Sequence, residues 1–143
     1  MFFATGDKFR DQGLLILRIG LGIMFMYHGA PKLFGGPEFW HKLGMAMGFL
    51  GIHFLPDFWG FMAAFAEFAG GILLIGGLFF RPACLLLVID MIVAMLMHLG
   101  SHQGLAIASH AIEDGIVFLG LLLIGPGAIS IDSWLTGKLR KRV

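Results

Sequence analysis

The sequence predicts an all-α membrane protein, a bundle of four transmembrane helices with a short interfacial helix between the first and second spans. Two observations predict this fold. Of the 143 residues, 58% are hydrophobic and only 13% are charged. A soluble domain of this size buries too small a share of its surface to hide so many apolar side chains. The apolar residues also gather in four runs, each close to the ~20 residues with which a helix crosses a bilayer.

The four predicted spans are, in chain order, residues 13–34, 57–80, 82–99 and 109–125. Glycine lets helix backbones approach closely in membranes, so Gly70-Gly71 and Gly76-Gly77 should mark the packing faces of the second span. The Arg81-Pro82 step leaves almost no loop between the second and third spans. These two spans are therefore expected to form an antiparallel hairpin.

The segment between the first two spans is too long for a bare turn. Within residues 38–51, apolar side chains recur at helical spacing at Trp40, Leu43, Met47 and Leu50. This spacing predicts a short helix lying in the membrane interface, where tryptophan is enriched. An irregular loop is the alternative.

The basic residues are divided unequally between the two sides of the predicted bundle. The less basic side has only Lys32 and Lys42. The other side carries Lys8, Arg10, Arg81, Lys138, Arg140, Lys141 and Arg142. The positive-inside rule therefore places both termini in the cytoplasm. The basic tail, residues 133–143, should contact anionic lipid headgroups. A net charge of +1 and the absence of a nucleic-acid motif argue against a nucleic-acid partner.

Each predicted span contains ionisable side chains, and three of them lie well inside the membrane. These are Arg18, Glu67 and Asp90 in the first, second and third spans. A charge at the bilayer centre costs on the order of 2.5–3.5 kcal/mol, so such residues usually face the bundle interior and pair. Arg18 is expected to pair with one of the two carboxylates. The pair would either serve function or only fix the helix register.

A second group of polar residues gathers near the less basic side. His28 and Lys32 end the first span, His98 and His102 close the third, and His110, Glu113 and Asp114 lie in the fourth. Imidazoles and carboxylates at one depth suit a proton-handling or metal site. The predicted metal ligands are His98, His102, His110 and Asp114, for copper, zinc or iron. The alternative is a set of interfacial histidines bonded to water or backbone.

These residues fall into short motifs that resemble the DoxX family of small membrane proteins along nearly the whole chain, 1–143, as a single domain. The motifs are RIGLG at 18–22, HGAPKL at 28–33, EFAGGILLIGGL at 67–78, RPA at 81–83 and GPGAISID at 125–132. The resemblance implies a four-helix bundle in a bacterial cytoplasmic membrane. By position, Arg18, His28, Lys32, Glu67, Arg81 and Asp132 match family-type residues, whereas His98, His102 and His110 lie outside the pattern.

The resemblance also implies a link to redox chemistry, because the family takes its name from a subunit of a thiosulfate:quinone oxidoreductase. Oxidation of a hydroquinone releases two protons, so its site needs bases. Glu67 and His28 are the expected bases, with Lys32 or Arg18 stabilising negative charge on a reduced oxygen. The expected quinone-binding residues are Arg18, His28, Glu67 and Asp90.

The sequence contains no haem-attachment motif, flavin fingerprint or cysteine pair, since Cys84 is its only cysteine. Electrons would therefore pass through a bound quinone, a histidine-held metal or a partner redox protein. Two alternatives stay open. One is a metal or small-solute binding or transport protein that uses the histidine and carboxylate layer and would need a homo-oligomer. The other is a membrane scaffold or maturation factor without catalysis of its own.

Overall fold

The computed structural model describes residues 9–140, and the side chains up to residue 137. Its elements are α1 (Arg10–Leu33), α2 (Pro37–Gly44), the 3-10 helix η2 (Met45–Leu50), α3 (Pro56–Gly76), α4 (Phe80–Gly100), α5 (Leu105–Ile124) and α6 (Ile131–Arg140). Within this range, α1, α3, α4 and α5 are the four helices that are long and apolar enough to cross a membrane. The predicted fold is confirmed, with α2 and η2 as the short helical segment between the first two spans.

The boundaries of the second span and of the hairpin turn differ from the prediction. α3 ends at Gly76, and Gly77 and Phe79 adopt left-handed backbone conformations with φ of 60° and 43°. A glycine in this conformation ends a helix readily because it has no Cβ to clash. The turn therefore lies at residues 77–79 rather than at Arg81-Pro82. Pro82 fits within the first turn of α4, where proline is tolerated.

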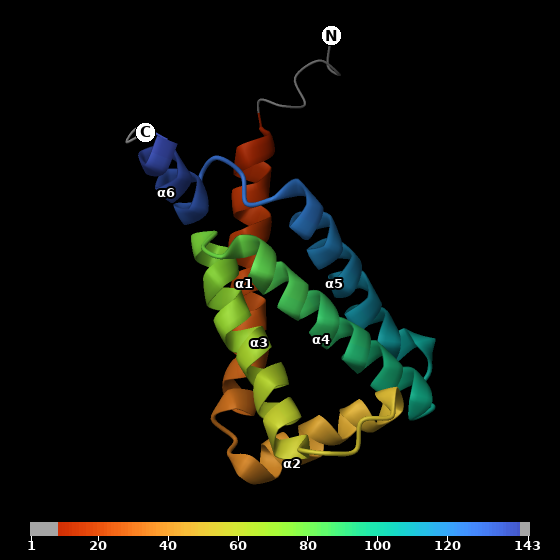
Figure 1. Cartoon of the computed structure of the whole chain (residues 1–143). Coiled ribbons are helices and arrows are strands. Elements are labelled where there is room, and N and C mark those ends of the chain that lie inside the picture. Colours follow the sequence, from red (N-terminus) through yellow and green to blue (C-terminus); the bar gives the residue numbers. More distant parts are fainter. Residues whose placement is uncertain (1–8, 141–143) are drawn as a thin grey trace.

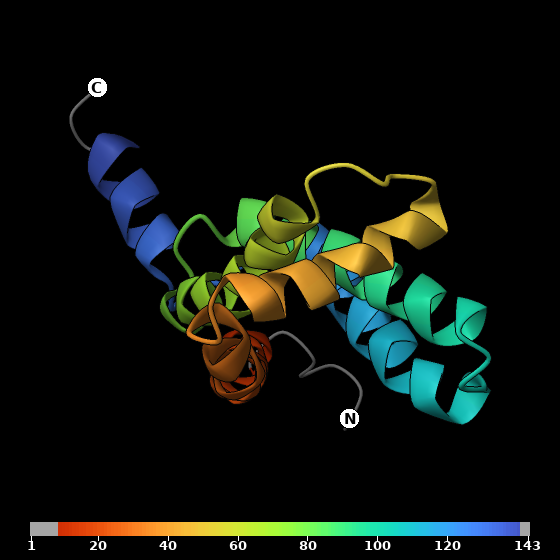
Figure 2. The same cartoon turned by 90° about the horizontal axis from the view of Figure 1, so that it is seen from below.

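The helices meet at one end of the bundle and separate at the other. Figure 1 shows the start of α1, the α3–α4 turn and the end of α5 at the same end, which we call the turn end. α2 lies across the opposite end, which we call the α2 end. α1 packs against α3, and α4 packs against α5. α3 and α4 diverge from their turn toward the α2 end, and the view from below shows α2 and η2 reaching from α1 and α3 toward α4 (Figure 2).

Close backbone contact joins α1 to α3. A Cβ at Gly22 would lie 2.6 Å from the carbonyl oxygen of Gly71, and one at Gly29 would lie 2.5 Å from the backbone nitrogen of Phe68. Both distances are too short for a side chain, so glycine is required. The predicted packing role of Gly71 is thereby confirmed.

Large apolar side chains fill the turn-end half of the bundle. Phe80, Leu87, Leu74 and Phe118 are fully buried there or nearly so. Phe25 of α1 meets Phe118 of α5 edge to face, with ring centroids 4.7 Å apart. This contact links the α1–α3 pair to the α4–α5 pair, so the four spans share one core.

Arg18 does not pair with Glu67 or Asp90, and the expectation of such a pair is wrong. Arg18 is 1% exposed. It donates hydrogen bonds to the carbonyl oxygens of Leu74 at 3.1 Å, Ile75 at 3.1 Å, Ile129 at 2.9 Å and Pro126. The first two carbonyls belong to the last turn of α3, which carries partial negative charge. The Leu74 carbonyl also accepts from the N–H of the cap residue Gly77 at 3.1 Å, whereas carbonyls of a last turn in general lack partners within their own helix. Arg18 therefore fastens α1 to the end of α3 and to the α5–α6 linker.

Asp132, another residue of the motifs, caps a helix that is distant in sequence. Its two carboxylate oxygens accept hydrogen bonds from the backbone N–H groups of Phe79 at 3.0 Å and Phe80 at 2.9 Å. These are orphan donors at the start of α4, where a carboxylate is favourable. Asp11 similarly accepts from the N–H of Ala128 at 2.9 Å. The turn end is thus held together by side-chain to backbone bonds.

The α1–α3 contact predicts a contrast between two neighbouring glycines. Gly22→Ala should destabilise the protein by about 1–3 kcal/mol, because its Cβ meets the backbone of α3 and the helices must separate. Gly20→Ala is the matched control, since nothing lies within 4 Å of a Cβ at that position. Unfolding in mixed micelles, followed by circular dichroism, measures the difference. Equal stability of the two variants would contradict the role assigned to this contact.

The bonds of Arg18 predict that even lysine cannot replace it. Arg18→Lys should lower the free energy of unfolding by at least about 2 kcal/mol, because an ammonium cannot reach carbonyls on two segments and leaves buried acceptors without donors. Arg10→Lys is the control on the same helix, since Arg10 is exposed and, among the described residues, its side chain donates a hydrogen bond only to the Ile124 carbonyl, at 3.4 Å. The same unfolding assay compares them. A lysine variant as stable as the wild type would overturn this account.

Candidate functional site

An apolar cavity lies where α3 and α4 diverge. Its volume is about 330 Å³. α3 and α4 form two of its walls, and α2 with η2 covers it at the α2 end. Its lining residues are Leu43, Gly44, Met47, Phe58, Trp59, Met62, Ala63, Ala66, Leu86, Ile89, Asp90 and Val93. Methionine and aromatic side chains predominate among the large ones, and such walls adapt to flat apolar molecules.

The cover is held close to α3. The N–H of the Trp40 indole donates to the Lys32 carbonyl at 3.0 Å, and this bond ties α2 to the end of α1. Gly44 and Gly60 are in such close contact with the opposite backbone that a Cβ at either would overlap it. Phe49 of η2 lies against Gly100 at the end of α4. α2 and η2 therefore bridge α3 and α4 and cover the cavity at the α2 end.

Two polar atoms of the cavity lining are buried and have no donor or acceptor opposite them among the described residues, although the Asp90 carboxyl also lies within hydrogen-bonding reach of the Glu67 carboxyl. They are the indole nitrogen Nε1 of Trp59 and the carboxylate oxygen Oδ2 of Asp90. One is a hydrogen-bond donor and the other is an acceptor when ionised. A buried polar group without a partner costs about 1–3 kcal/mol, so such groups usually mark a ligand, a water or a catalytic role.

Next to Asp90, a row of ionisable residues crosses the bundle. Lys32 Nζ lies 2.5 Å from Glu67 Oε1, and the two side chains are 30% and 7% exposed. The carboxyl of Asp90 neighbours that of Glu67 and lies in the field of Lys32. Glu67 Oε2 is also buried without a partner. Lys32 was expected in a separate layer with His28, but its long side chain reaches inward from the end of α1 and joins the interior carboxylates.

This row can hold charge and protons at the edge of an apolar space. Two carboxyl groups and one ammonium carry a net charge of −1 when both acids are ionised, and none when one acid holds a proton. Loss or gain of one proton therefore leaves no large uncompensated charge inside the membrane. Asp90 lies between the cavity and Glu67, so it is the member of the row that a ligand in the cavity would meet.

The other predicted residues lie apart from this row. His28 and His110 are exposed, and Asp114 is half-buried between α5 and α1, with His110, Glu113 and His28 as its charged neighbours. This position leaves His28 and Asp114 outside the cavity lining.

His98 and His102 do not act as a pair. α4 ends at Gly100, between them. His98 Nδ1 is hydrogen-bonded to the side-chain oxygen of Gln103 at 2.7 Å, and His102 lies in the following turn with φ of 55°. Among the residues that the structure describes, no three His, Cys, Asp or Glu side chains converge closely enough to hold a metal ion. A metal site at His98, His102, His110 and Asp114 stays a prediction that needs a rearrangement of these side chains.

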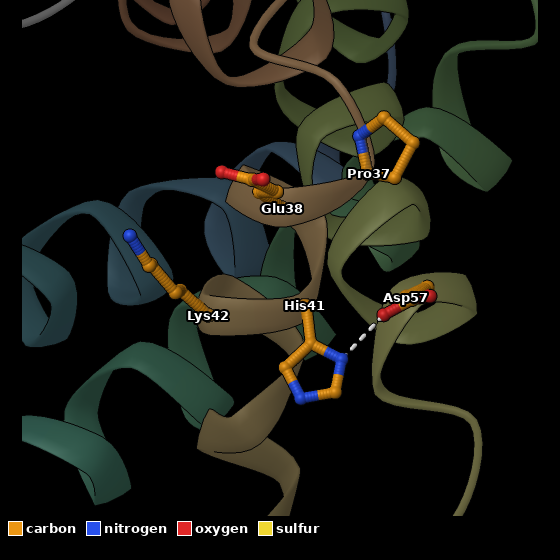
Figure 3. A pocket seen from close by; sticks show the side chains of 5 residues that line it. All are labelled: Pro37, Glu38, His41, Lys42 and Asp57. Carbon is orange, nitrogen blue, oxygen red and sulfur yellow. Dashed lines mark hydrogen bonds and ion pairs between the residues drawn. The ribbon is translucent and has the colours of Figure 1, made fainter.

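A shallow hollow opens on the outside of α2, away from the cavity. Figure 3 shows its residues Pro37, Glu38, His41 and Lys42 on α2 and Asp57 at the start of α3. His41 Nδ1 lies 2.6 Å from Asp57 Oδ1. Both side chains are more than half exposed, so this pair contributes little to stability and serves as a surface tie between α2 and α3.

Sequence reasoning missed Trp59 as a site residue. It also missed the pair of His41 and Asp57. No spacing in the chain connects Trp59 with Asp90, which is 31 positions later. The only available signal for this site was a tryptophan and an acid inside two adjacent spans. Trp59 and Asp90 reach one cavity because α3 and α4 diverge from their turn.

The chain was compared with known proteins. The family profile of DoxX matches residues 13–100. An uncharacterized protein from Haemophilus influenzae is 32% identical over 133 residues, which cover 89% of this chain and 93% of that protein. No solved structure matches. The matched region holds α1, α3 and α4, and with them the row of Lys32, Glu67 and Asp90. The chain is an integral membrane protein that belongs to the DoxX family.

Proposed function

We propose that this protein binds a lipid-soluble quinone or quinol in the cavity between α3 and α4, as a quinone-linked redox protein or the membrane subunit of an oxidoreductase. One observation carries the proposal. The cavity is apolar, yet its lining includes a buried indole N–H of Trp59 without an acceptor and a buried carboxylate oxygen of Asp90 without a donor, among the described residues. A ring that carries oxygen atoms on an otherwise apolar body supplies both missing partners.

The cavity is large enough for the ring headgroup of a quinone but not for its whole isoprenoid tail. Its volume of about 330 Å³ is at the lower end of the roughly 300–1,000 Å³ of small-molecule pockets. One or two fused rings fit such a space, and a longer isoprenoid tail would extend between α3 and α4 into the bilayer. Exposed Leu86 and Ile89 of α4 line the cavity and border the lipid, so a tail leaving there stays in an apolar environment.

Each residue of the site has a distinct role in this proposal. When bound, the quinone supplies the exchange of two electrons and two protons. The N–H of Trp59 donates to one ring oxygen and orients the ring. Asp90 Oδ2 accepts a hydrogen bond, and a proton, from a ring hydroxyl. Glu67 receives that proton next, while the Lys32 ammonium keeps the charge of the row nearly constant. The segment α2–η2 keeps water from the cavity.

The row of Lys32, Glu67 and Asp90 differs in part from the site that the sequence predicted. Glu67 and Lys32 keep their proposed functions, and Asp90 becomes the residue nearest the ligand. Arg18 is committed to backbone carbonyls at the turn end, so it has a positioning role only. His28 lies on the outer flank of α1. With no electron-carrying motif in the sequence, a partner redox protein is the proposed source or acceptor of electrons.

We also propose on which side of the membrane the site lies. The basic residues at the turn end, among them Arg10 and Arg81, favour the cytoplasm for that end. Lys8, Lys141 and Arg142 lie outside the described residues, as do the side chains of Lys138 and Arg140. Both termini would then be cytoplasmic in a bacterial inner membrane. The cavity and α2 would lie toward the outer leaflet.

Binding of a short-chain quinone tests the proposal. The purified protein in lipid nanodiscs should quench its tryptophan fluorescence saturably with ubiquinone-1 or menadione. Asp90→Asn and Trp59→Phe should each weaken binding by about tenfold, the cost of one lost buried hydrogen bond. The matched controls are Asp114→Asn, an acid inside a span but outside the cavity, and Trp134→Phe on α6. For the Trp59→Phe variant, displacement of a bound quinone measured by equilibrium dialysis replaces fluorescence.

Two results would contradict this proposal. One is the absence of saturable binding by the wild type with both quinones. The other is an equal loss of affinity in Asp90→Asn and Asp114→Asn. Either result would favour a protein that acts as a scaffold or carries a different solute.

The buried ion pair predicts a strong energetic coupling. A double-mutant cycle with Lys32→Met and Glu67→Gln should give a coupling energy above about 1 kcal/mol, because each single change leaves the other group inside the membrane without its partner. The same cycle with His41→Ala and Asp57→Ala should give less than about 1 kcal/mol, since that pair is exposed to solvent. Unfolding in mixed micelles provides the four free energies of each cycle. Equal coupling in the two pairs would show that Lys32 and Glu67 are not shielded from water.

A further inference from the structure

One polar surface of the bundle has no role in the proposed site. His110, Glu113 and Asp114 lie within five consecutive residues of α5, and His28 of α1 is an electrostatic neighbour of Asp114. We call these four residues the α1–α5 polar face. His28, His110 and Glu113 are exposed, while Asp114 is half-buried among the other three. None of the four lines the cavity near Trp59 and Asp90.

The depth of Glu113 makes this face unusual. It is the ninth residue of a 20-residue helix. It therefore lies about 12 Å from one end of α5 and about 16 Å from the other, close to the middle of the span. A carboxylate at that depth is costly against lipid, and such residues nearly always face protein or a water-filled space. No side chain that the structure describes forms a hydrogen bond or ion pair with Glu113, so a partner for its carboxylate has to come from outside the described residues.

The composition of the face indicates what covers it. Each copy presents two imidazoles, which can carry positive charge, and two carboxyl groups. A two-fold axis places a surface against itself, so a face with both kinds of group is complementary to its own copy. Glu113 and His110 are neighbouring residues of one face of α5, three positions apart. Two such helices crossing near this point bring each carboxylate to the imidazole of the other.

The neighbouring surface permits close approach of a second helix. Gly120 lies seven positions after Glu113 and therefore on the same side of α5. Nothing lies within 4 Å of a Cβ at Gly120, so the surface is open there. Small residues beside polar ones are typical of contacts between membrane helices. Leu17 and Met24 of α1 lie eleven and four positions before His28, and therefore on the same side of the helix. They are about half exposed and add apolar area.

We propose that the α1–α5 polar face is the interface of a two-fold symmetric homodimer in the membrane, with Glu113 of each protomer against the partner subunit's His110. Asp114, which is half-buried beside Glu113, and His28 then lie at the edge of the interface. The cavity opens between α3 and α4, which are not part of this face, so each protomer keeps its own site.

Energy transfer between labelled copies in vesicles tests the dimer. Gly137→Cys on α6 provides an exposed label site with open space around it, while the native Cys84 is buried. Donor- and acceptor-labelled wild-type protein should associate when reconstituted together. Glu113→Gln should raise the dissociation constant by about tenfold, the value expected from one interhelical polar contact in a membrane. Asp57→Asn, an exposed carboxylate outside this face, should leave it unchanged.

A charge exchange then tests the pairing of Glu113 with His110. Glu113→Lys copies and His110→Asp copies should each associate less than the wild type, because like charges meet across the axis. A mixture of the two should associate again, because it restores opposite charges in both contacts. Wild-type protein that stays monomeric at every density overturns the proposal. So does equal association of Glu113→Gln and Asp57→Asn, or a mixture that does not recover although both variants insert. Should the lysine variant fail to insert, the wild-type and Glu113→Gln results decide the question.

Discussion

The guanidinium of Arg18 joins three parts of the chain that are far apart in sequence, and the geometry of the whole bundle depends on this junction. It donates to two carbonyls in the last turn of α3 and to two in the α5–α6 linker. A charged group inside the membrane must keep its donors occupied, so these segments cannot separate without a large cost. The caps by Asp132 and Asp11 act at the same end. The turn end is therefore the rigid part of the molecule.

The open end follows from this arrangement. Glycine contacts keep α3 on α1 along most of its length, whereas α4 is joined to α3 only near the turn and follows α5 instead. The two pairs of helices diverge, and α2 with η2 closes the wedge. The space between them is lined mainly by apolar side chains, but it lies at the depth of Glu67 and Asp90. A cavity of this kind keeps buried acids away from bulk water and near a ligand that dissolves in lipid.

Hydropathy was sufficient to predict the four spans, because the thickness of the bilayer fixes their length and each lies in one apolar run. A packing face on the second span was also predicted from Gly70-Gly71, although the sequence did not indicate which helix packs against it. The pairing of charges was not predicted correctly. Arg18 was expected opposite a carboxylate because charges attract, but the partial charge of a helix end is invisible in a list of ionisable residues. Lys32 was assigned to the outer layer because its Cα lies there, although its side chain reaches one turn inward. To predict Trp59 as a site residue, one would need to know where α2 and η2 lie, and no periodicity in the sequence specifies that.

Two acids near the middle of the bundle show that the surroundings of an acid in a membrane span, rather than its depth, indicate its role. Asp90 and Glu113 both lie about halfway along a span, and their depth alone does not distinguish them. Asp90 faces the interior, beside Glu67 and an apolar cavity with an unpartnered indole. Glu113 faces outward, beside imidazoles on a surface that continues into an open glycine. In water, an exposed acid needs no explanation, but lipid reverses this expectation because it offers no hydrogen bonds. An inward acid at a cavity therefore indicates a small ligand, and an outward acid with complementary neighbours indicates another protein surface.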